Sequence, residues 1–497
     1  MSLGRACIVF ALAAAAAASS CARQGGSAAL DGDPSTLPRL EAIIVQTPLP
    51  PGWRLSEGGE ARVAIELQAG RAGAKDGPGE LSAPAGKRWL VPALMLADPR
   101  FSMSADEARS HGLEPLDEVI PPQRAAAIDG FWPGQTGYPF EEDLRLAVRA
   151  SKGELPSEIS SWALEAAKRA DEDAERPIAL GATGDIQVGP REGSLLISGE
   201  EGKAAVLGQG LLPLLRSFDF LIGNLEGQIS LRGEPNPRKR YLFRFPPGTA
   251  AALKSAGFGL LLLGNNHALD YGLDALRDTF GDFDGAGLPY VGAGLDAAAA
   301  ASPKVVRIAG SNRGFAFLGF AAFPKENMGF STEEAAAAKD RPGVNADEAG
   351  TVAAIRSAAA AGEVVVVLCH GGREYLDDPP EDVKERYRRF VDAGAALVIG
   401  SHPHVLQGVE ARGSSLIAYS LGNFLFTGER EPPAGQRGAL VSILMYRGIA
   451  RGLRLYPLSV TYEGSYLNGD AAAAEGRFAR LCAALSAAPQ ESPAASP

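Results

Sequence analysis

Short, continuously apolar runs alternate with segments of helical periodicity from residue 177 onward. Such runs are typical of strands that are buried on both faces of a sheet. We expect strands at residues 177–183, 219–224, 258–264, 314–320, 363–370 and 396–401. We expect helices between them at residues 207–218, 248–258, 274–283, 349–362 and 381–394. The alternation of strand and helix predicts a layered α/β domain.

Three later segments alternate more between apolar and polar positions than the runs before them. These segments are residues 415–426, 438–446 and 452–463. Alternation of this kind favours antiparallel strands, which we expect to close the domain. The main domain is therefore expected at residues 176–465. Residues 484–497 are Ala-, Ser- and Pro-rich, and we expect a disordered tail there.

The chain before residue 176 predicts a smaller N-terminal α/β accessory region at residues 39–175. Its candidate strands lie at residues 41–49, 62–69 and 86–96. An acidic stretch at residues 171–176 marks the boundary with the main domain. A length of 497 residues agrees with two or three domains.

The first 20 residues are typical of an export signal. Arg5 supplies a positive charge, and residues 6–18 form an apolar run too short to span a bilayer comfortably. Small residues then precede Cys21, an order typical of a lipoprotein cleavage site. We expect residues 1–20 to be removed, Cys21 to be lipidated and residues 21–38 to form a tether. This predicts a membrane-anchored lipoprotein at the cell envelope, periplasmic or on the cell surface. Simple secretion and an uncleaved anchor are the alternatives.

The net charge and the cysteines further restrict the functions and the covalent bonds that we expect. A formal net charge of −11 argues against a general nucleic-acid binder. Cys369 lies within a valine-rich run, so we expect a small buried core residue there. A reactive thiol, or a disulfide with Cys482, is the alternative.

Four of the five histidines lie in three short motifs, each of which follows or ends an expected strand. The motifs are GNNHALDYG at 264–272, VVVVLCHGG at 364–372 and IGSHPH at 399–404. Asp185 and Glu226 also follow expected strands. Because function gathers at the carboxyl ends of strands in α/β sheets, we expect these side chains to converge in one crevice. Imidazoles, carboxylates and an Asn amide together are what a divalent-metal hydrolytic site needs.

These motifs together resemble the CapA family, which is associated with poly-γ-glutamate capsule synthesis and belongs to the calcineurin-like metallophosphoesterase superfamily. The resemblance covers residues 178–430 approximately. It is carried by GDIQVG (184–189), NLEG (224–227), NNHALDYG (265–272), HGGREY (370–375), GSHPHVLQGVE (400–410) and YSLGNFLF (419–426). It implies an αββα-type metallophosphoesterase-like sandwich for the main domain.

The resemblance also implies a role for each site residue. Two divalent ions, manganese, iron or zinc, would be bound by Asp185, Glu226, Asn266, His370, His402 and His404. Asp185 would touch both metals. His267 would be the catalytic histidine, which protonates the leaving oxygen or stabilises the transition state. The superfamily usually has Asp-x-His where this chain has Asp185-Ile186-Gln187, so one metal position is expected to be weak.

A basic segment at residues 232–248 lies between two of the motifs. Its cations, together with one beyond His370, are candidates for a wall that binds a phosphate or a polyanion. These candidates are Arg238, Lys239, Arg240, Arg244 and Arg373. A solvated loop and hairpin is the alternative for the segment.

Three functions agree with this sequence. The first is hydrolysis of a phosphoester by a metal-activated hydroxide, in the metabolism of an envelope or capsule polymer such as poly-γ-glutamate. The second is metal-dependent cleavage of an amide or γ-glutamyl bond. The third is non-enzymatic binding or anchoring of an anionic surface polymer. Tightly bound metals in the purified protein would favour the hydrolytic functions, and a metal-free protein would favour the binding function.

Overall fold

The computed structural model describes most of the chain from residue 175 onward and parts of what precedes it. The described residues are 175–427, 437–467 and 471–487, together with parts of 27–172. The expected signal at residues 1–20 and the expected lipidation site, Cys21, lie outside them.

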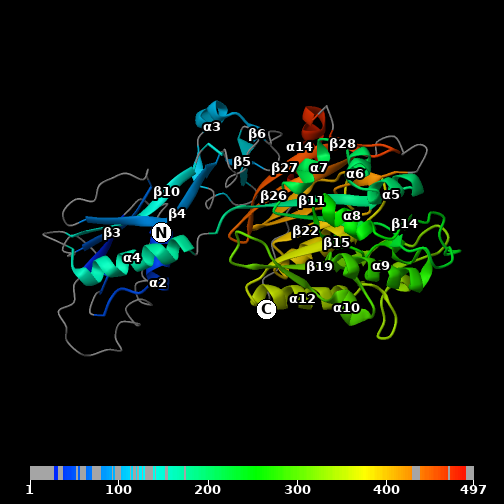
Figure 1. Cartoon of the computed structure of the whole chain (residues 1–497), viewed down its shortest axis with the longest axis horizontal. Helices are drawn as coiled ribbons and strands as arrows, with labels where there is room; N and C mark the ends of the chain where they lie inside the picture. The colour runs from blue at the N-terminus through cyan, green and yellow to red at the C-terminus, as the bar shows by residue number, and fades with distance from the viewer. Residues whose placement is uncertain are drawn as a thin grey trace. The chain divides into compact units, whose positions relative to one another are not determined.

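The chain divides into two compact units, whose elements are labelled in Figure 1. The smaller unit comprises Met1–Val91 and Gly137–Glu175, and the larger unit comprises Pro92–Thr136 and Arg176–Pro497. The middle of the expected accessory region therefore groups with the larger unit. Within it, β5 (Ala93–Met95) pairs with β8 (Gln123–Ala125), which extends the large sheet beside β27 (Ile449–Val460). Because this pairing joins residues far apart in the chain, no local sequence pattern indicates it.

The described residues of the smaller unit form one sheet and two helices. Its strands follow the order β2 (Arg54–Leu55), β1 (Ser27–Asp31), β3 (Val63–Ala69), β10 (Glu141–Ala150) and β4 (Glu80–Val91). The helices α2 (Leu37–Gln46) and α4 (Ser157–Glu172) share a buried apolar cluster with the sheet, which includes Ile65 and Trp162.

The structure differs from two expectations for this unit. Residues 41–46, expected in a strand, belong to α2, because Leu40, Ile43 and Ile44 recur at helical spacing and are all buried. The expected tether contains β1, which pairs in parallel with β3. Pairing with a distant strand here overrides the local composition.

The larger unit contains two large sheets. The first follows the order β16 (Tyr290–Val291), β15 (Phe258–Leu262), β12 (Phe220–Leu225), β11 (Ile178–Gln187), β26 (Arg437–Tyr446), β27, β8 and β5. The second follows the order β18 (Lys304–Arg307), β19 (Gly314–Ala322), β21 (Val364–Gly371), β22 (Leu397–Ser401), β24 (Ser415–Ala418) and β23 (Val409–Arg412). Strands β11, β12 and β15 are mutually parallel, as are β19, β21 and β22.

Side chains along β21 show how the two sheets pack. Val364, Val366 and Leu368 belong to a buried cluster that also contains residues of β11, β12 and β26, so this face packs against the other sheet. Val365 and Val367 belong to a different cluster, shared with helix α13 (Glu381–Asp392). Both faces of the strand are buried, which is why its sequence is continuously apolar.

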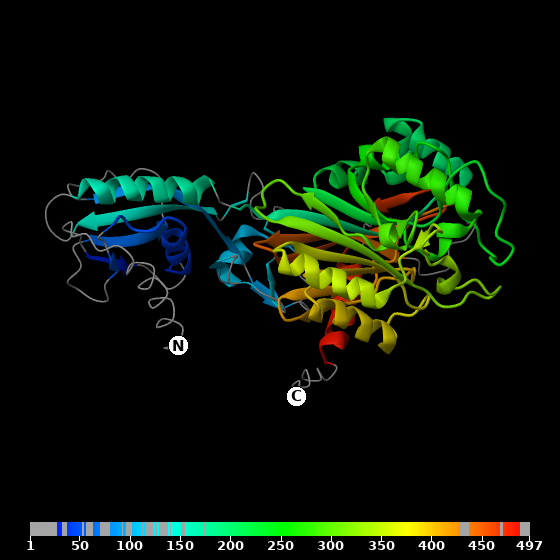
Figure 2. The ribbon, with the colours of Figure 1, turned by 90° about the horizontal axis from the view of Figure 1, so that it is seen from below.

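Helices cover the outer faces of both sheets, so the larger unit is an α/β sandwich. In Figure 2 the green helices lie on one side of the sheets, and the yellow helices lie on the other. The first group is α5 (Pro190–Ile197), α6 (Glu200–Leu207), α7 (Leu211–Arg216), α8 (Thr249–Ala256) and α9 (Gly272–Ala286). The second group is α12 (Glu348–Ala360) and α13. All five helices expected in this region are present, although α7 is shorter than its expected range.

Shorter elements complete the larger unit. They are β6 (Ser102–Met103), α3 (Ala105–His111), β9 (Ala127–Ile128), β13 (Gln228–Ile229), β14 (Arg244–Phe245), β17 (Ala293–Gly294), α10 (Ala297–Ala301), α11 (Thr332–Ala335), β20 (Gly343–Val344) and β28 (Ser465–Leu467).

The expected closing strands are confirmed in part. Strands β26 and β27 are antiparallel, as expected for residues 438–446 and 452–463. Residues 415–426 instead form two strands in different sheets. Strand β24 runs parallel to β22, and β25 (Asn423–Phe426) runs parallel to β11. The segment passes from one sheet to the other at Gly422, whose carbonyl accepts a hydrogen bond from the Asp185 N–H at 2.9 Å.

Helix α14 (Ala471–Ala487) ends the described chain and includes the first residues of the expected disordered tail. Its Phe478 and Cys482 are buried in the cluster between the sheets. Cys369 and Cys482 are both buried, and no disulfide joins them. None of the helices in the described part of the chain combines the length and hydropathy needed to cross a lipid bilayer.

Candidate metal centre

Strand ends from both sheets supply the candidate site. Asp185 lies near the end of β11, and Glu226 directly follows β12. Asn266 and His267 begin the short 3-10 helix η2 (Asn266–Leu269), just beyond β15. The other sheet contributes His370 from β21 and the His402–His404 turn after β22. Because β11, β12 and β15 are parallel in one sheet and β21 and β22 are parallel in the other, these residues reach the same edge of the sandwich.

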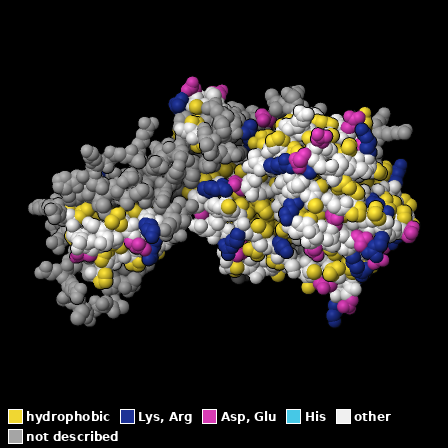
Figure 3. Space-filling view, in the orientation of Figure 1, with side chains coloured by type: hydrophobic (Ala, Val, Ile, Leu, Met, Phe, Trp, Pro, Cys, Tyr) yellow, Lys and Arg dark blue, Asp and Glu magenta, His cyan; other side chains and the backbone are white. Residues whose placement is uncertain are grey.

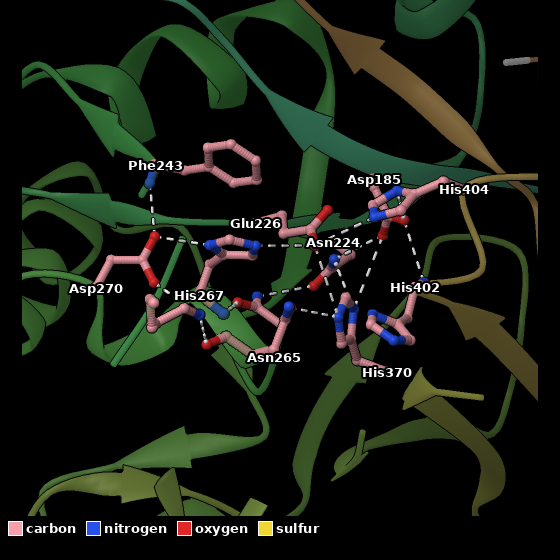
Figure 4. Close-up of polar contacts among 12 residues, drawn as sticks. Asp185, Asn224, Glu226, Phe243, Asn265, His267, Asp270, His370, His402 and His404 are labelled. Carbon is pink, nitrogen blue, oxygen red and sulfur yellow. Dashed lines mark hydrogen bonds and ion pairs between the residues drawn. The ribbon is translucent and has the colours of Figure 1, made fainter. Parts of the chain in front are cut away.

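The structure brings all six expected metal ligands together, as Figure 4 shows for most of them. Ligand atoms of Glu226, His402 and His404 all lie within 4.8 Å of one another. Glu226 Oε1 is also 3.7 Å from His370 Nε2, and Asp185 Oδ2 is 3.4 Å from His404 Nδ1. The Asn266 side-chain oxygen lies 2.9 Å from His370 Nε2.

Several of these buried polar atoms have no hydrogen-bond partner in the described structure. They include both carboxylate oxygens of Glu226, both ring nitrogens of His402 and the side-chain oxygen of Gln187. A buried polar atom without a partner costs free energy, so most native ones are paired. Lone pairs on carboxylate, imidazole and amide groups that converge in this way are suited to a divalent cation.

Burial and neighbouring charges shift the pKa values of the cluster strongly. Burial, reinforced by Asp185, raises the pKa of Glu226 well above its usual range. Burial lowers the pKa of His402 to about 3. Burial alone would also lower the pKa of His404, but Glu226 and Asp185 outweigh it and raise the value to about 10. The cluster therefore combines a neutral imidazole with an imidazolium that is paired to carboxylates.

Three asparagines that the sequence analysis did not assign hold the cluster in place. Asn224 donates from Nδ2 to Asp185 Oδ1 at 2.8 Å and accepts from Asn265 Nδ2 at 3.1 Å. Asn423 Oδ1 lies 2.8 Å from His404 Nδ1. These asparagines lie in the motifs NLEG, NNHALDYG and YSLGNFLF, each of which is at or next to the end of a strand. That position is the sequence signal that could have identified them.

His267 lies beside the cluster and has its own partners. Its Nδ1 is 2.7 Å from Asp270 Oδ2, and its Nε2 is 3.8 Å from Glu226 Oε1. Phe243 stacks on the imidazole with ring centroids 4.0 Å apart. Asp270 was not among the expected site residues, although its spacing of three residues from His267 within a helical turn was a usable signal.

The five cationic side chains expected to form a binding wall differ in their burial and in their partners. Lys239 is buried and ion-paired, Arg238 pairs with Glu334, and Arg244 donates to the Arg232 carbonyl at 2.7 Å. The remaining two, Arg240 and Arg373, are exposed and form no ion pair within the described residues.

The surface shows no broad field of one sign on the face drawn. Lys and Arg side chains are interspersed with Asp and Glu there (Figure 3). A cationic binding surface among the described residues of this face would therefore be local.

We compared the sequence with models of known protein families, and one of them covers the region that contains the buried cluster. The family model described as Bacterial capsule synthesis protein PGA_cap matches residues 179–428, half of the chain. This chain belongs to the CapA family of poly-γ-glutamate capsule synthesis proteins. The matched CapA region runs from β11 to β25 and so contains every candidate metal ligand.

Curated relatives agree with the CapA assignment. The PGA biosynthesis protein CapA of Bacillus subtilis is 34% identical over 229 residues, 46% of this chain and 58% of that protein. The Capsule biosynthesis protein CapA of Bacillus anthracis is 34% identical over 229 residues, 43% of this chain and 52% of that protein. A Probable polyglutamine synthesis accessory protein of Mycobacterium tuberculosis is 33% identical over 214 residues, 41% of this chain and 55% of that protein. The match thus spans little more than half the length of these relatives.

Proposed function

We propose that this chain is an exported CapA-family protein of envelope or capsule polymer metabolism, with a metal-dependent, phosphoesterase-type site. The observation that supports it most is the buried cluster in which the carboxylate of Glu226 and the imidazole of His402 have no hydrogen-bond partner among the described residues. The larger unit, with helices outside two packed sheets and the cluster at strand ends, agrees with a metallophosphoesterase-like sandwich.

The residues present fit a divalent metal. Glu226, His402 and His404 would form its nearest ligand set, and Asp185, Asn266 and His370 lie close enough to complete one or two positions. When bound, the metal would supply Lewis acidity and an activated hydroxide at neutral pH. Manganese, iron or zinc suits these N and O ligands. Gln187 contributes an amide oxygen where the superfamily usually has imidazole, so one position would be weaker.

His267 would handle a proton at the leaving oxygen. Its Nδ1 faces Asp270, which leaves Nε2 directed toward Glu226 and the cluster. Burial, reinforced by Lys239, lowers the pKa of His267 well below its usual range. An anionic substrate at the cluster would oppose that shift and favour the protonated imidazole, which is the form that donates a proton.

The polymer class comes from the relatives. Two of them are named for PGA or capsule biosynthesis, and we carry poly-γ-glutamate to this chain as the candidate polymer. Export agrees with the sequence of residues 1–21, and anchoring would follow from a lipid on Cys21.

Metal analysis combined with a substrate screen tests the proposal. Purified protein would be reconstituted with manganese, iron or zinc, its bound metal counted by mass spectrometry, and hydrolysis of a phosphodiester measured. We expect bound metal and turnover in the wild type and neither in Glu226→Gln. A wild type that binds none of the three metals would rule out the hydrolytic site.

A non-enzymatic role is the second candidate, favoured by Gln187 and by the exposed Arg240 and Arg373, which form no ion pair within the described part of the chain. In that case the protein would bind poly-γ-glutamate without cleaving it, and Arg240→Ala with Arg373→Ala would weaken binding. Release of glutamate from the polymer in the same screen would instead favour γ-glutamyl hydrolysis.

A further inference from the structure

Lys239 is a buried cation surrounded by oxygen atoms. Its side chain is 0% exposed, and Nζ lies 2.9 Å from Asp270 Oδ1, 3.0 Å from Glu326 Oε1 and 2.5 Å from the Asn266 carbonyl oxygen. The ammonium also lies 4.8 Å from the centroid of the Phe330 ring. A buried ammonium is costly unless its partners are well placed, so its contacts indicate what it organises.

One set of contacts leads to His267. Asp270 uses Oδ1 for Lys239 and Oδ2 for His267 Nδ1, at 2.9 and 2.7 Å. The Phe243 N–H also donates to Oδ2, at 2.5 Å. An ionised Asp270 only accepts hydrogen bonds, so it holds the neutral imidazole with its proton on Nδ1 and leaves Nε2 free toward the cluster.

The other set of contacts leads to Asn266. Glu326 Oε1 forms an ion pair with Lys239 and accepts a hydrogen bond from the Asn266 side-chain Nδ2 at 3.2 Å. This bond fixes which way the amide points. The opposite amide atom, Oδ1, then faces His370 Nε2 at 2.9 Å. A single ammonium thus contacts both carboxylates that orient the Asn266–His267 pair.

We propose that Lys239 is a positioning residue that sets the His267 tautomer through Asp270 and the Asn266 amide orientation through Glu326. The orientation follows from contacts in the protein alone, and its catalytic consequence rests on the proposed function. Burial raises the pKa of Asp270 to about 7 even though Lys239 lowers it, so without the ammonium the carboxyl would hold a proton at neutral pH. A protonated Asp270 can donate to Nδ1, which would move the imidazole proton to Nε2.

Nitrogen NMR of the full-length protein labelled at histidine tests this without any activity. His267→Gln identifies the resonances. In the metal-free wild type above about pH 7, where Asp270 is ionised, we expect His267 as one tautomer with the proton on Nδ1. In Lys239→Met we expect that tautomer to be lost. Lys203→Met is the matched control, because Lys203 is another buried lysine, paired with Glu200 at 3.1 Å in α6. It should leave the His267 signals unchanged.

A double-variant comparison separates positioning from general stability. Asp270→Asn should change the His267 signals, and adding Lys239→Met to it should change them no further, because both residues act through the same bond. If Lys239→Met does not fold, Lys239→Met with Glu326→Gln removes one charge of each sign and serves instead. A folded variant that lacks Lys239 and keeps the wild-type tautomer would overturn the proposal.

Activity gives a separate readout. Lys239→Met should lower kcat by about 10–100-fold while metal remains bound, since residues that support a site typically have effects of this size. If the wild type hydrolyses nothing but the tautomer changes as expected, the proposed function fails and the positioning role stands. If the wild type is active and Lys239→Met matches it in kcat and tautomer, the positioning role fails alone.

Discussion

Glu226 is a buried side chain of the cluster whose polar atoms are not balanced by hydrogen bonds. It is 0% exposed, and both its carboxylate oxygens lack hydrogen-bond partners in the described structure. Leaving a buried polar group unpaired costs about 1–3 kcal/mol, and more for a charged group. Natural proteins retain such costs mainly where function needs them. A bound cation would offset this cost directly.

His267 and His402 should respond differently to substitution. We expect His402→Ala to lose both metal and activity, because His402 belongs to the set whose ligand atoms converge. We expect His267→Ala to keep its metal and to lose about 10²–10⁴-fold in rate, the usual effect of removing a general acid. Metal content and kcat of the two variants provide the test. Equal metal depletion in both would make His267 a ligand instead.

Metal affinity should depend on pH through His404. Its pKa is raised to about 10 from 6.5 in the metal-free protein, and metal binding needs the neutral ring. Affinity should therefore rise with pH toward about 10. The pKa of His404 is higher in the folded state than in the unfolded state, so protonated His404 stabilises the fold. This stabilisation is complete below pH 6.5 and is lost as the pH rises through about 10.

Titration of the metal by calorimetry at several pH values measures the affinity, and urea unfolding of the metal-free protein measures the stability. His404→Gln is the control for both, because it removes the titrating group. An affinity that does not change with pH in the wild type would contradict this assignment.

At the level of elements, the backbone of the turn after β22 determines where the imidazoles of His402 and His404 point. His402 and His404 have φ values of 97° and 56°, in the left-handed region that non-glycine residues rarely adopt. Each such residue costs on the order of 1–3 kcal/mol, and such costs concentrate at functional sites. The turn places both rings in the buried cluster, so the strain is tied to the site.

Strand β11 comes so close to the β24–β25 connection at Gly184 that we expect no room for a side chain there. An added Cβ there would lie 1.8 Å from the Gly422 carbonyl oxygen. We expect Gly184→Ala to displace this connection, to cost on the order of 1–3 kcal/mol and to reduce metal binding by shifting the neighbouring Asp185. Urea unfolding and metal content give the two measurements.

Gly281→Ala is the matched control for that substitution. Gly281 lies in α9, and its added Cβ would meet nothing within 4 Å. Alanine is the better helix former, so the change should stabilise the protein by about 0.5–1 kcal/mol. Equal behaviour of the two variants would show that the Gly184 contact is unimportant.

At the scale of the whole molecule, the cluster joins the two sheets of the larger unit. Ligands from β11 and β12 lie on one sheet, and those from β21 and β22 lie on the other. A metal that binds only the folded state should therefore stabilise the larger unit. At about 100 times Kd the gain is roughly 2.7 kcal/mol. Scanning calorimetry should show a higher Tm with metal for the wild type and no shift for Glu226→Gln. A metal-independent Tm in both would argue against the site.

Attachment of the whole protein to a membrane should depend on Cys21. We expect Cys21→Ser to move the protein from the membrane fraction to the soluble fraction, because no lipid could be added at that position. Fractionation of cells that express each form gives the measurement. Retention of the serine variant in the membrane would favour an uncleaved anchor.

The sequence by itself determined that the main domain is α/β and indicated which candidate ligands converge. Continuous apolar runs identified the buried parallel strands, since a strand covered on both faces has no polar side. Polar ligand-type residues directly after those strands identified the cluster, because parallel strands end at a common edge. Local periodicity was less reliable in the smaller unit, where residues 41–46 form a helix and residues 27–31 form a strand.

Only the tertiary structure decided how the site residues are held. Lys239 lies between two arginines, Arg238 and Arg240, yet its side chain is buried between Asp270 and Glu326. The supporting asparagines and the joining of β8 to β27 also depend on contacts between residues distant in the chain. A sequence pattern reports the average environment of a segment, whereas these contacts depend on how separate segments pack against one another.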